Sequence, residues 1–172
     1  MNTSRISLIA AVFAAITSLV AAPVAAAQGK ILFRGQISNA YDDTRWVLDG
    51  DSGTLIDNVR PGTYEHYTSS RWIVASARDH GYVTIKNAKT DRCAKPDLVN
   101  PDAYVQVRPC DRHDDMQKWN ISEAGVISPK NDPDLAITVT ELNPAGYSWL
   151  VLKDRSQVQN SPDSVFEFTS GR

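Results

Sequence analysis

The stretch Gln117-Lys118-Trp119-Asn120-Ile121 decides the fold, because a similar stretch recurs at a fixed spacing along the chain. Forty-seven residues before Trp119 the sequence reads Ser70-Arg71-Trp72-Ile73-Val74, and 47 residues after it the sequence reads Ser164-Val165-Phe166-Glu167-Phe168. Each copy has a large aromatic residue followed by an apolar or aromatic residue one or two places later. Equal spacing of this kind predicts an internal repeat of three structural units.

The aromatic residues Trp72, Trp119 and Phe166 predict a shared core. Each is a large apolar group at one equivalent place in its unit, and such a side chain buries roughly 150–250 Å². A single unit of this kind cannot bury its apolar face alone. We therefore expect the three units to close on one another around these three rings.

Short apolar and alternating runs, separated by Gly, Pro, Asn and Asp, predict strands and turns along the rest of the chain. The clearest runs are 31–37, 46–48, 55–59, 72–74, 82–85, 93–94, 104–108, 125–127, 135–139, 149–152 and 166–168. No stretch shows a sustained helical period of about 3.6 residues. The sequence therefore predicts an all-β domain with about twelve strands, roughly four in each unit.

The first 27 residues have the pattern of a secretory signal peptide. Arg5 supplies a positive charge, residues 6–20 are mostly apolar, and Ala25-Ala26-Ala27 gives the small residues that a signal peptidase requires. The apolar run is short for a bilayer span and ends without a basic cluster. We expect cleavage after Ala27 and secretion to the outside of the cell; an uncleaved membrane anchor is the alternative.

Composition excludes several classes of partner. Of the 172 residues, 145 remain once the first 27 are removed, which suffices for one domain with its own core. Without Arg5, 17 basic residues stand against 20 acidic ones, a net charge of −3. Because no basic stripe or polybasic run occurs, binding to nucleic acid or to anionic lipid has no support. No later segment is apolar enough to span a membrane.

Cys93 and Cys110 are the only cysteines of the chain. In a secreted protein two cysteines are expected to pair, because the compartment is oxidising. Closing a loop of this size contributes about 3 kcal/mol in the chain-entropy description. The alternatives are a free thiol or a metal pair, and a metal pair would want a tighter spacing with His or Cys partners nearby.

Together these features resemble the ricin-type β-trefoil lectins, whose repeats end in a Gln-x-Trp motif and carry a cysteine pair before it. The resemblance covers residues 28–172 and implies a six-stranded barrel capped by three hairpins. Only the middle repeat has the full signature, with Gln117 and Trp119, whereas Ser70 and Ser164 stand where the family has Gln. The repeats are expected at about 28–78, 79–123 and 124–172.

The resemblance also implies where a sugar would bind. The family places an Asp two residues after the first cysteine, a stacking aromatic in the strand before the second, and a polar residue just ahead of the Gln-x-Trp motif. In this sequence those positions hold Lys95, Arg108 and Met116, and only Gln117 matches. The galactose chemistry of the family is therefore not carried over to this chain.

A shifted sugar site remains the hypothesis. In the middle repeat, acidic and amide side chains would accept hydrogen bonds from sugar hydroxyls, and a tyrosine ring would stack on the sugar. The candidate ligand residues are Asp97, Asn100, Asp102, Tyr104 and Gln117. In the third repeat, Tyr147 and Trp149 lie where a ring is expected at the surface. The alternatives are that the loop residues only form turns and that Trp149 belongs to the core.

No catalytic or metal-binding set is recognisable. The run Asp111-Arg112-His113-Asp114-Asp115 lacks the ligand spacing of a metal loop, and no nucleophile, zinc or phosphate-loop motif occurs. We expect no metal, no cofactor and no enzymatic activity, with a hydrolase as the weakest hypothesis. Asn120-Ile121-Ser122 fits a glycosylation sequon, but its place in the repeat motif predicts a buried strand position.

The sequence thus predicts a secreted carbohydrate-binding module whose partner is a glycan or a glycoprotein. The second hypothesis is a trefoil that has lost sugar binding and docks a protein partner, in the manner of trefoil toxin subunits or protease inhibitors. That hypothesis rests on analogy of fold alone.

Overall fold

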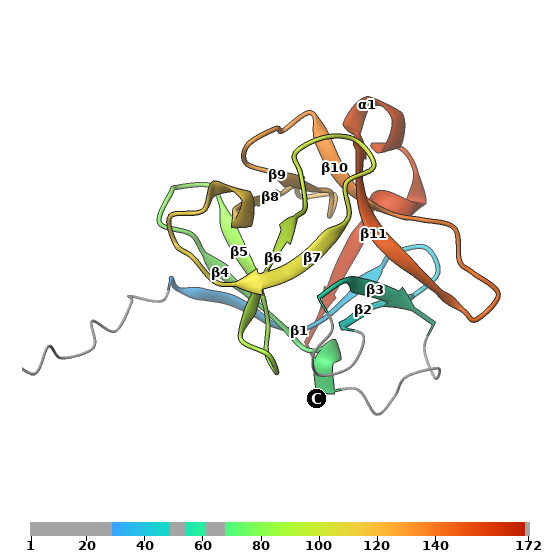
Figure 1. Ribbon diagram of the computed structural model, residues 1–172, viewed down its shortest axis with the longest axis horizontal. Helices are drawn as coiled ribbons and strands as arrows, with labels where there is room; N and C mark the ends of the chain where they lie inside the picture. The colour runs from blue at the N-terminus through green and yellow to red at the C-terminus, as the bar shows by residue number, and fades with distance from the viewer. Residues whose placement is uncertain (1–28, 49–53, 61–67, 171–172) are drawn as a thin grey trace, which may run out of the picture.

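The computed structural model describes residues 29–48, 54–60 and 68–170, and the predicted signal peptide at residues 1–27 lies outside them. The described residues form twelve strands and four short helical segments (Figure 1). This confirms the all-β prediction. The strands are β1 (Ile31–Asn39), β2 (Arg45–Leu48), β3 (Ile56–Val59), β4 (Trp72–Ser76), β5 (Val83–Asn87), β6 (Arg92–Pro96), β7 (Val105–Pro109), β8 (Trp119–Ile121), β9 (Ile127–Pro129), β10 (Leu135–Val139), β11 (Tyr147–Asp154) and β12 (Phe166–Thr169). The helical segments are η1 (Thr68–Ser70), η2 (Asp115–Gln117), α1 (Arg155–Val158) and η3 (Pro162–Ser164).

Six of the strands form a barrel. Strand β1 pairs with β4 and β12, β4 pairs with β5, β5 pairs with β8, and β8 pairs with β9. The ring closes where the amide of Phe166, at the start of β12, donates to the carbonyl oxygen of Gly125, just before β9, at 3.1 Å.

The other six strands form three hairpins, β2–β3, β6–β7 and β10–β11. The hairpins join edge to edge, because β3 pairs with β11, Leu55 bridges to Gln106, and Tyr104 bridges to Val151. Figure 1 shows β3, β7 and β11 meeting in this arrangement. A six-stranded barrel with a cap of three hairpins is the predicted β-trefoil, and four strands fall within each predicted repeat.

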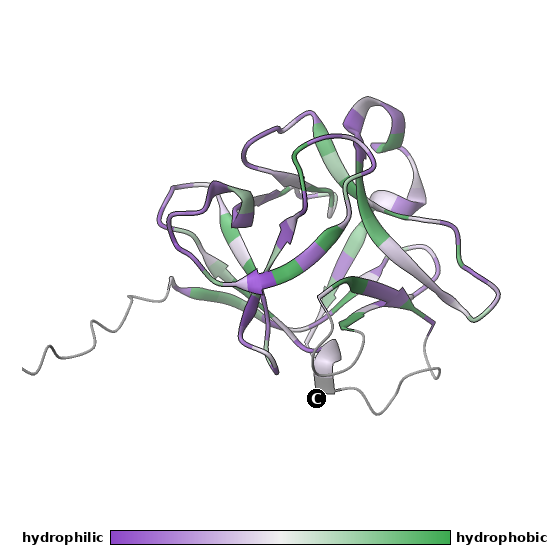
Figure 2. Cartoon of the chain, viewed as in Figure 1, coloured by the Kyte–Doolittle hydropathy of each residue, from purple (hydrophilic) through white to green (hydrophobic). Residues whose placement is uncertain are grey.

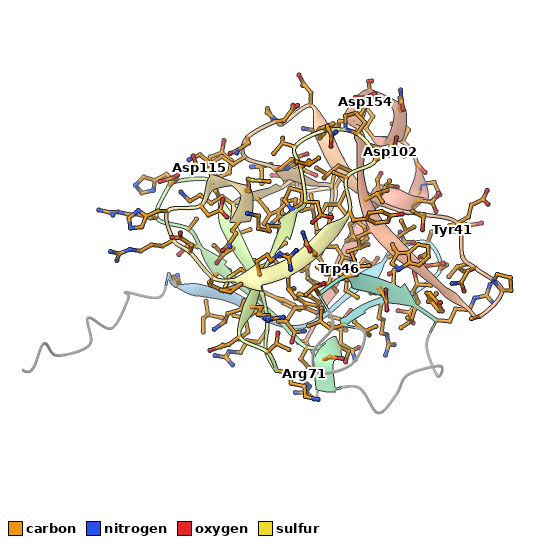
Figure 3. The ribbon with its side chains drawn as sticks, viewed as in Figure 1. Tyr41, Trp46, Arg71, Asp102, Asp115 and Asp154 are labelled. Atoms are coloured by element: carbon orange, nitrogen blue, oxygen red, sulfur yellow. A yellow bond between two sulfur atoms is a disulfide. The ribbon has the colours of Figure 1, made fainter. Side chains whose placement is uncertain are left out.

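The three repeated aromatics are buried in one core, as predicted. Trp72, Trp119 and Phe166 belong to a single buried cluster with Trp46. The Trp46 ring stands edge to face against Trp72 at 5.8 Å and against Phe166 at 5.2 Å between centroids, and it lies in the middle of the molecule (Figure 3). Apolar residues gather on the strands and polar residues on the connecting turns (Figure 2).

Hydrogen bonds from two of these rings show the internal repeat at atomic detail. The indole Nε1–H of Trp72 donates to the carbonyl oxygen of Trp46 at 2.9 Å, and that of Trp119 donates to the carbonyl oxygen of Ala94 at 3.0 Å. In each case a ring at the start of a barrel strand bonds the first strand of a hairpin. The barrel and its cap are therefore tied together in the same way in two repeats.

Cys93 on β6 and Cys110 just after β7 form a disulfide, as expected from the sequence. The glycosylation sequon differs from expectation, because Asn120 is exposed rather than buried. Side chains alternate along β8, so Trp119 points to the core and Asn120 points outward, where its Nδ2 donates to the Gly81 carbonyl oxygen at 3.3 Å. Among the described residues no helix is long and apolar enough to cross a membrane.

Candidate functional site

The loop between β6 and β7 brings together four of the predicted sugar-binding residues. The amide of Asp97 donates to the carbonyl oxygen of Tyr104 at 2.9 Å and closes the hairpin, while that of Ala103 donates to Asn100 at 3.4 Å. All four of these predicted residues, Asp97, Asn100, Asp102 and Tyr104, are exposed. These residues form a turn, as the alternative interpretation held, and they also lie at the surface together.

This loop is held against the third repeat. The amide of Asp102 donates to the carbonyl oxygen of Leu152 at 2.8 Å, and the Asp102 carboxylate pairs with Lys153 of β11. The Leu152 amide donates in turn to Ala103 at 2.9 Å. Asp102 adopts a φ of 68°, a left-handed conformation that Asp tolerates better than most residues. Figure 3 shows Asp102 at the end of the molecule that carries α1 and Asp154.

Contact between the two repeats creates a row of aromatic rings, Tyr147–Trp149–Tyr104, which we call the aromatic row. The Tyr104 and Trp149 centroids lie 6.2 Å apart with an angle of 85° between the ring planes. The Tyr147 and Trp149 centroids lie 5.9 Å apart at 79°. Both pairs have the edge-to-face geometry that aromatic rings prefer. The predicted residues of the second and third repeats therefore form one surface.

Alternation along β11 explains why these rings face solvent. Ser148 and Leu150 point inward and are buried, whereas Tyr147 and Trp149 point outward and are half-buried. Tyr104 is 42% exposed. The interpretation of Trp149 as a core residue is therefore wrong.

Polar groups surround the aromatic row. Asp57 of β3 lies directly opposite Trp149 in the β3–β11 register, and the ion pair of Asp102 with Lys153 lies at the Tyr104 end. The backbone amide of Trp149 donates to Oγ1 of Thr140 at 3.0 Å. The row thus combines apolar ring surface with neighbouring polar and charged groups.

The positions that hold sugar in the ricin-type lectins serve other purposes here. Lys95 Nζ lies 2.8 Å from Asp114 Oδ2, so this lysine pairs within its own repeat. Gln117 is buried; its Oε1 accepts from the Asp111 amide and its Nε2 donates to the Pro109 carbonyl oxygen, both at 2.9 Å. Because both ends of the Gln117 side chain bond backbone, we assign it a structural role and drop it from the sugar-binding set.

The run Asp111–Asp115 forms turns, as its composition predicts. Asp111 Oδ1 accepts from the His113 amide at 2.8 Å, and Asp114 Oδ1 accepts from the Met116 amide at 2.9 Å, where it caps η2. In the described ranges no group of three or more His, Cys, Asp or Glu side chains is arranged to hold a metal ion.

Four charged side chains, Asp79, Asp115, Lys118 and Lys130, form a second polar group that sequence reasoning missed. Lys118 Nζ lies 3.0 Å from Asp79 and 2.6 Å from Asp115; Lys130 Nζ lies 3.1 Å from Asp115 and also pairs with Asp79. Hydrogen bonds from Lys130 and Lys118 lower the pKa of Asp79 to about 2. The two positive and two negative charges neutralise one another, so we do not regard this four-charge cluster as a binding site. Because Lys130 belongs to the third repeat and the other three residues to the second, the cluster links these two repeats.

An open polar depression beside α1 was also missed by sequence reasoning. It is lined by Asp134, Asp154, Arg155, Ser156 and Gln159. The Arg155 amide donates to the Asp134 carbonyl oxygen at 2.6 Å and fixes α1 on the end of β10. The lining residues come from the two ends of one hairpin and a single helical turn, and no motif in the sequence marks them.

Comparison with known proteins defines the fold. No model of a known protein family matches the chain, and no curated protein sequence is similar to it. Solved structures are similar, including the designed three-fold symmetric protein ThreeFoil, with a TM-score of 0.69 and 10% identity over 80% of this chain and 99% of that one. The chain therefore has the architecture of a three-fold β-trefoil.

Two natural proteins have the same architecture. The C-half of an earthworm R-type lectin, solved in complex with GalNAc, gives a TM-score of 0.58 and 13% identity over 81% of this chain and 99% of that one. A chain of the cytolethal distending toxin of Actinobacillus actinomycetemcomitans gives a TM-score of 0.65 and 10% identity over 79% of this chain and 90% of that one. The fold is thus that of the ricin-type lectins and of toxin subunits, as the sequence predicted.

Proposed function

We propose that this protein is a secreted carbohydrate-binding module without catalytic activity, and that the aromatic row holds the glycan. Secretion follows from the predicted signal peptide and its cleavage after Ala27. The partner is a glycan or a glycoprotein, and no cofactor takes part. The fold shared with lectins is consistent with this function but does not carry it, because one fold serves many functions.

The observation that carries the proposal is that three adjacent rings, one exposed and two half-buried, lie on one face of the cap. Large aromatic side chains are ordinarily drawn into the core, and a contiguous patch of them at the surface marks a binding site. The faces of these rings suit the apolar C–H face of a sugar, while Trp149 Nε1–H and the tyrosine hydroxyls suit its hydroxyl groups. Asp57 and the Asp102–Lys153 ion pair lie beside the same rings.

Docking of a protein partner is the second candidate function, and Leu98 favours it. This residue lies in the β6–β7 loop and is 63% exposed, close in the chain to Tyr104. A leucine has no hydrogen-bonding group for a sugar, and an exposed leucine near aromatic rings resembles the apolar centre of a protein interface. The two functions differ in which of these residues they require.

A glycan array probed with the purified protein tests the proposal. We expect specific binding that falls about tenfold or more in Trp149→Ala, the loss that follows from removing a stacked ring worth about 1.4 kcal/mol. Tyr41→Ala is the matched control, because Tyr41 is 74% exposed and lies in the β1–β2 turn. A blank array would contradict the proposal, and a stable partner protein released by Leu98→Asp would then establish the docking function.

A further inference from the structure

We infer that the aromatic row binds an extended, uncharged glycan chain that runs along β11, one chain to each protein molecule. The inference rests on the proposed carbohydrate-binding function and names its ligand class. It differs from the arrangement that three similar repeats suggest, in which each repeat would hold one terminal sugar.

The rings are arranged in a line rather than around a pocket. Tyr147 and Trp149 are two residues apart on β11, so they point to the same face, about 6.6 Å apart along the strand. Tyr104 bridges to Val151, which lies two residues further along β11 on that face. Centroid spacings of 5.9 and 6.2 Å follow the same direction. A single sugar ring is about as large as one aromatic ring, so three rings in line offer contacts to several linked sugars.

The row lies at the surface, because Tyr104 is 42% exposed and Tyr147 and Trp149 are half-buried. The polar depression beside α1 is lined by other residues, namely 134, 154–156 and 159. A terminal sugar is best recognised in a concave pocket, where polar groups converge on it from several sides. An open row instead admits a chain that continues beyond the protein at both ends, past Tyr147 on one side and past Tyr104 on the other.

The charges beside the row disfavour an acidic ligand. Asp57 lies opposite Trp149, and Asp97 and Asp102 are exposed in the loop that carries Tyr104. Lys153 at this end is paired with Asp102. A sialic acid carboxylate or a sulfate would therefore lie beside the exposed carboxylate of Asp97, which repels it, whereas a neutral hydroxyl group can donate a hydrogen bond to that carboxylate.

The other two hairpins do not repeat the row in the described residues. On β3 the positions that face Trp149 and Tyr147 are Asp57 and Val59. On β7 the residues that share a face with Tyr104 are Gln106 and Arg108, and neither is aromatic. Among the residues that the structure describes on the three hairpins, aromatic rings lie in line only at β11 and the adjoining Tyr104. We therefore expect one site for each molecule.

The test is a glycan array graded in chain length from a single sugar upward, with neutral, sialylated and sulfated versions of each chain. We expect binding to rise with the number of neutral sugar units and to fall when acidic groups are added. Calorimetric titration with the strongest neutral chain should give a stoichiometry of one. Tyr147→Ala should weaken binding of that chain about tenfold. Tyr147→Phe, which keeps the ring and loses only the hydroxyl, should weaken it less, and Tyr41→Ala should leave the affinity within about twofold.

Three results would overturn the inference while leaving the carbohydrate-binding function intact: equal affinity for a single sugar and for its chains, a stoichiometry of two or three, or preference for sialylated or sulfated glycans. A blank array would overturn both. Circular dichroism and a thermal melt of Tyr147→Ala separate lost binding from lost folding, and the Phe variant gives the length dependence if the Ala variant unfolds.

Discussion

The backbones of Gly125 and Phe166 lie against each other where the barrel closes. The Phe166 amide donates to the Gly125 carbonyl oxygen at 3.1 Å, and a Cβ atom on residue 125 would lie 2.3 Å from the Phe166 carbonyl oxygen. Gly125 also has a φ of 83°, in the left-handed region that favours glycine. The last strand of the chain is therefore seated at a position that only glycine fits without movement of the backbone.

Gly125→Ala is predicted to destabilise the protein by about 2–4 kcal/mol, because the cost of the left-handed backbone conformation and the cost of the clash with Phe166 add together. Urea denaturation followed by tryptophan fluorescence would measure this loss as a lower midpoint with an unchanged slope.

Gly81→Ala is the matched control for that experiment. Gly81 has the same φ of 83°, but an added Cβ would meet no atom within 4 Å. Only the conformational cost of roughly 1–2 kcal/mol should appear. Equal losses in the two variants would show that the contact with Phe166 does not limit barrel closure.

The four-charge cluster predicts a loss of stability in acid. Hydrogen bonds from Lys130 and Lys118 hold the pKa of Asp79 at about 2, below its ordinary value of 3.8. Since the folded pKa is the lower one, the contribution of Asp79 is complete above pH 3.8 and disappears as the pH falls towards 2. The free energy of unfolding, measured in urea across this range, should fall more steeply in the wild type than in Asp79→Asn.

An exposed ion pair gives the control for the acid experiment. Lys86 and Asp91 pair at 2.6 Å, with the Asp91 side chain 78% exposed, and such surface pairs contribute about 0–1 kcal/mol. Asp91→Asn should therefore leave the acid limb of the stability curve unchanged. Identical acid limbs in wild type and Asp79→Asn would contradict the role given to the cluster.

The same four-charge cluster predicts a second loss of stability at alkaline pH. A hydrogen bond with Asp115, and then one with Asp79, raises the pKa of Lys118 above its ordinary value of 10.5. A raised lysine pKa gives stability that is complete below pH 10.5 and is lost as the pH rises through the folded value. Unfolding in urea above pH 10.5 should show this decline in the wild type and a smaller one in Lys118→Met, which keeps the buried chain length.

Gln117→Ala separates a structural glutamine from a sugar ligand. Removal of two hydrogen bonds at a buried side chain should cost about 1–3 kcal/mol of stability, with unchanged affinity on the glycan array. The control is Gln157→Ala, at an exposed position of α1, which should change neither the stability nor the glycan affinity. Weakened glycan binding with full stability in Gln117→Ala would return this residue to the binding site.

The sequence predicts those parts of the fold that each repeat carries within itself. Trp72, Trp119 and Phe166 are evenly spaced and buried, so spacing alone located the core. Trp46, which contacts both Trp72 and Phe166, has no such counterpart in the other repeats. The exposure of Asn120 was predictable, because side chains alternate on a strand and Trp119 points inward.

Contacts between repeats cannot be predicted from the sequence patterns. The sequence suggests both Tyr104 and Trp149 as surface rings, but nothing in it shows that they touch. Their contact depends on the bridge between Tyr104 and Val151, which is set by how the three hairpins join. The four-charge cluster likewise draws Asp79, Asp115 and Lys130 from segments up to 51 residues apart.

The disulfide should contribute stability without contributing to ligand binding. Cys93 and Cys110 close a 17-residue separation near the base of the β6–β7 hairpin, while Tyr104 lies at the opposite end of that hairpin. Replacing both cysteines with alanine should lower the free energy of unfolding by about 3 kcal/mol and leave glycan affinity unchanged. Urea denaturation with and without reductant, together with the intact mass of alkylated protein, would measure this. Two free thiols in the native protein would contradict the pairing, and a loss of glycan affinity in the folded double variant would show that the disulfide orders the loop that carries Tyr104.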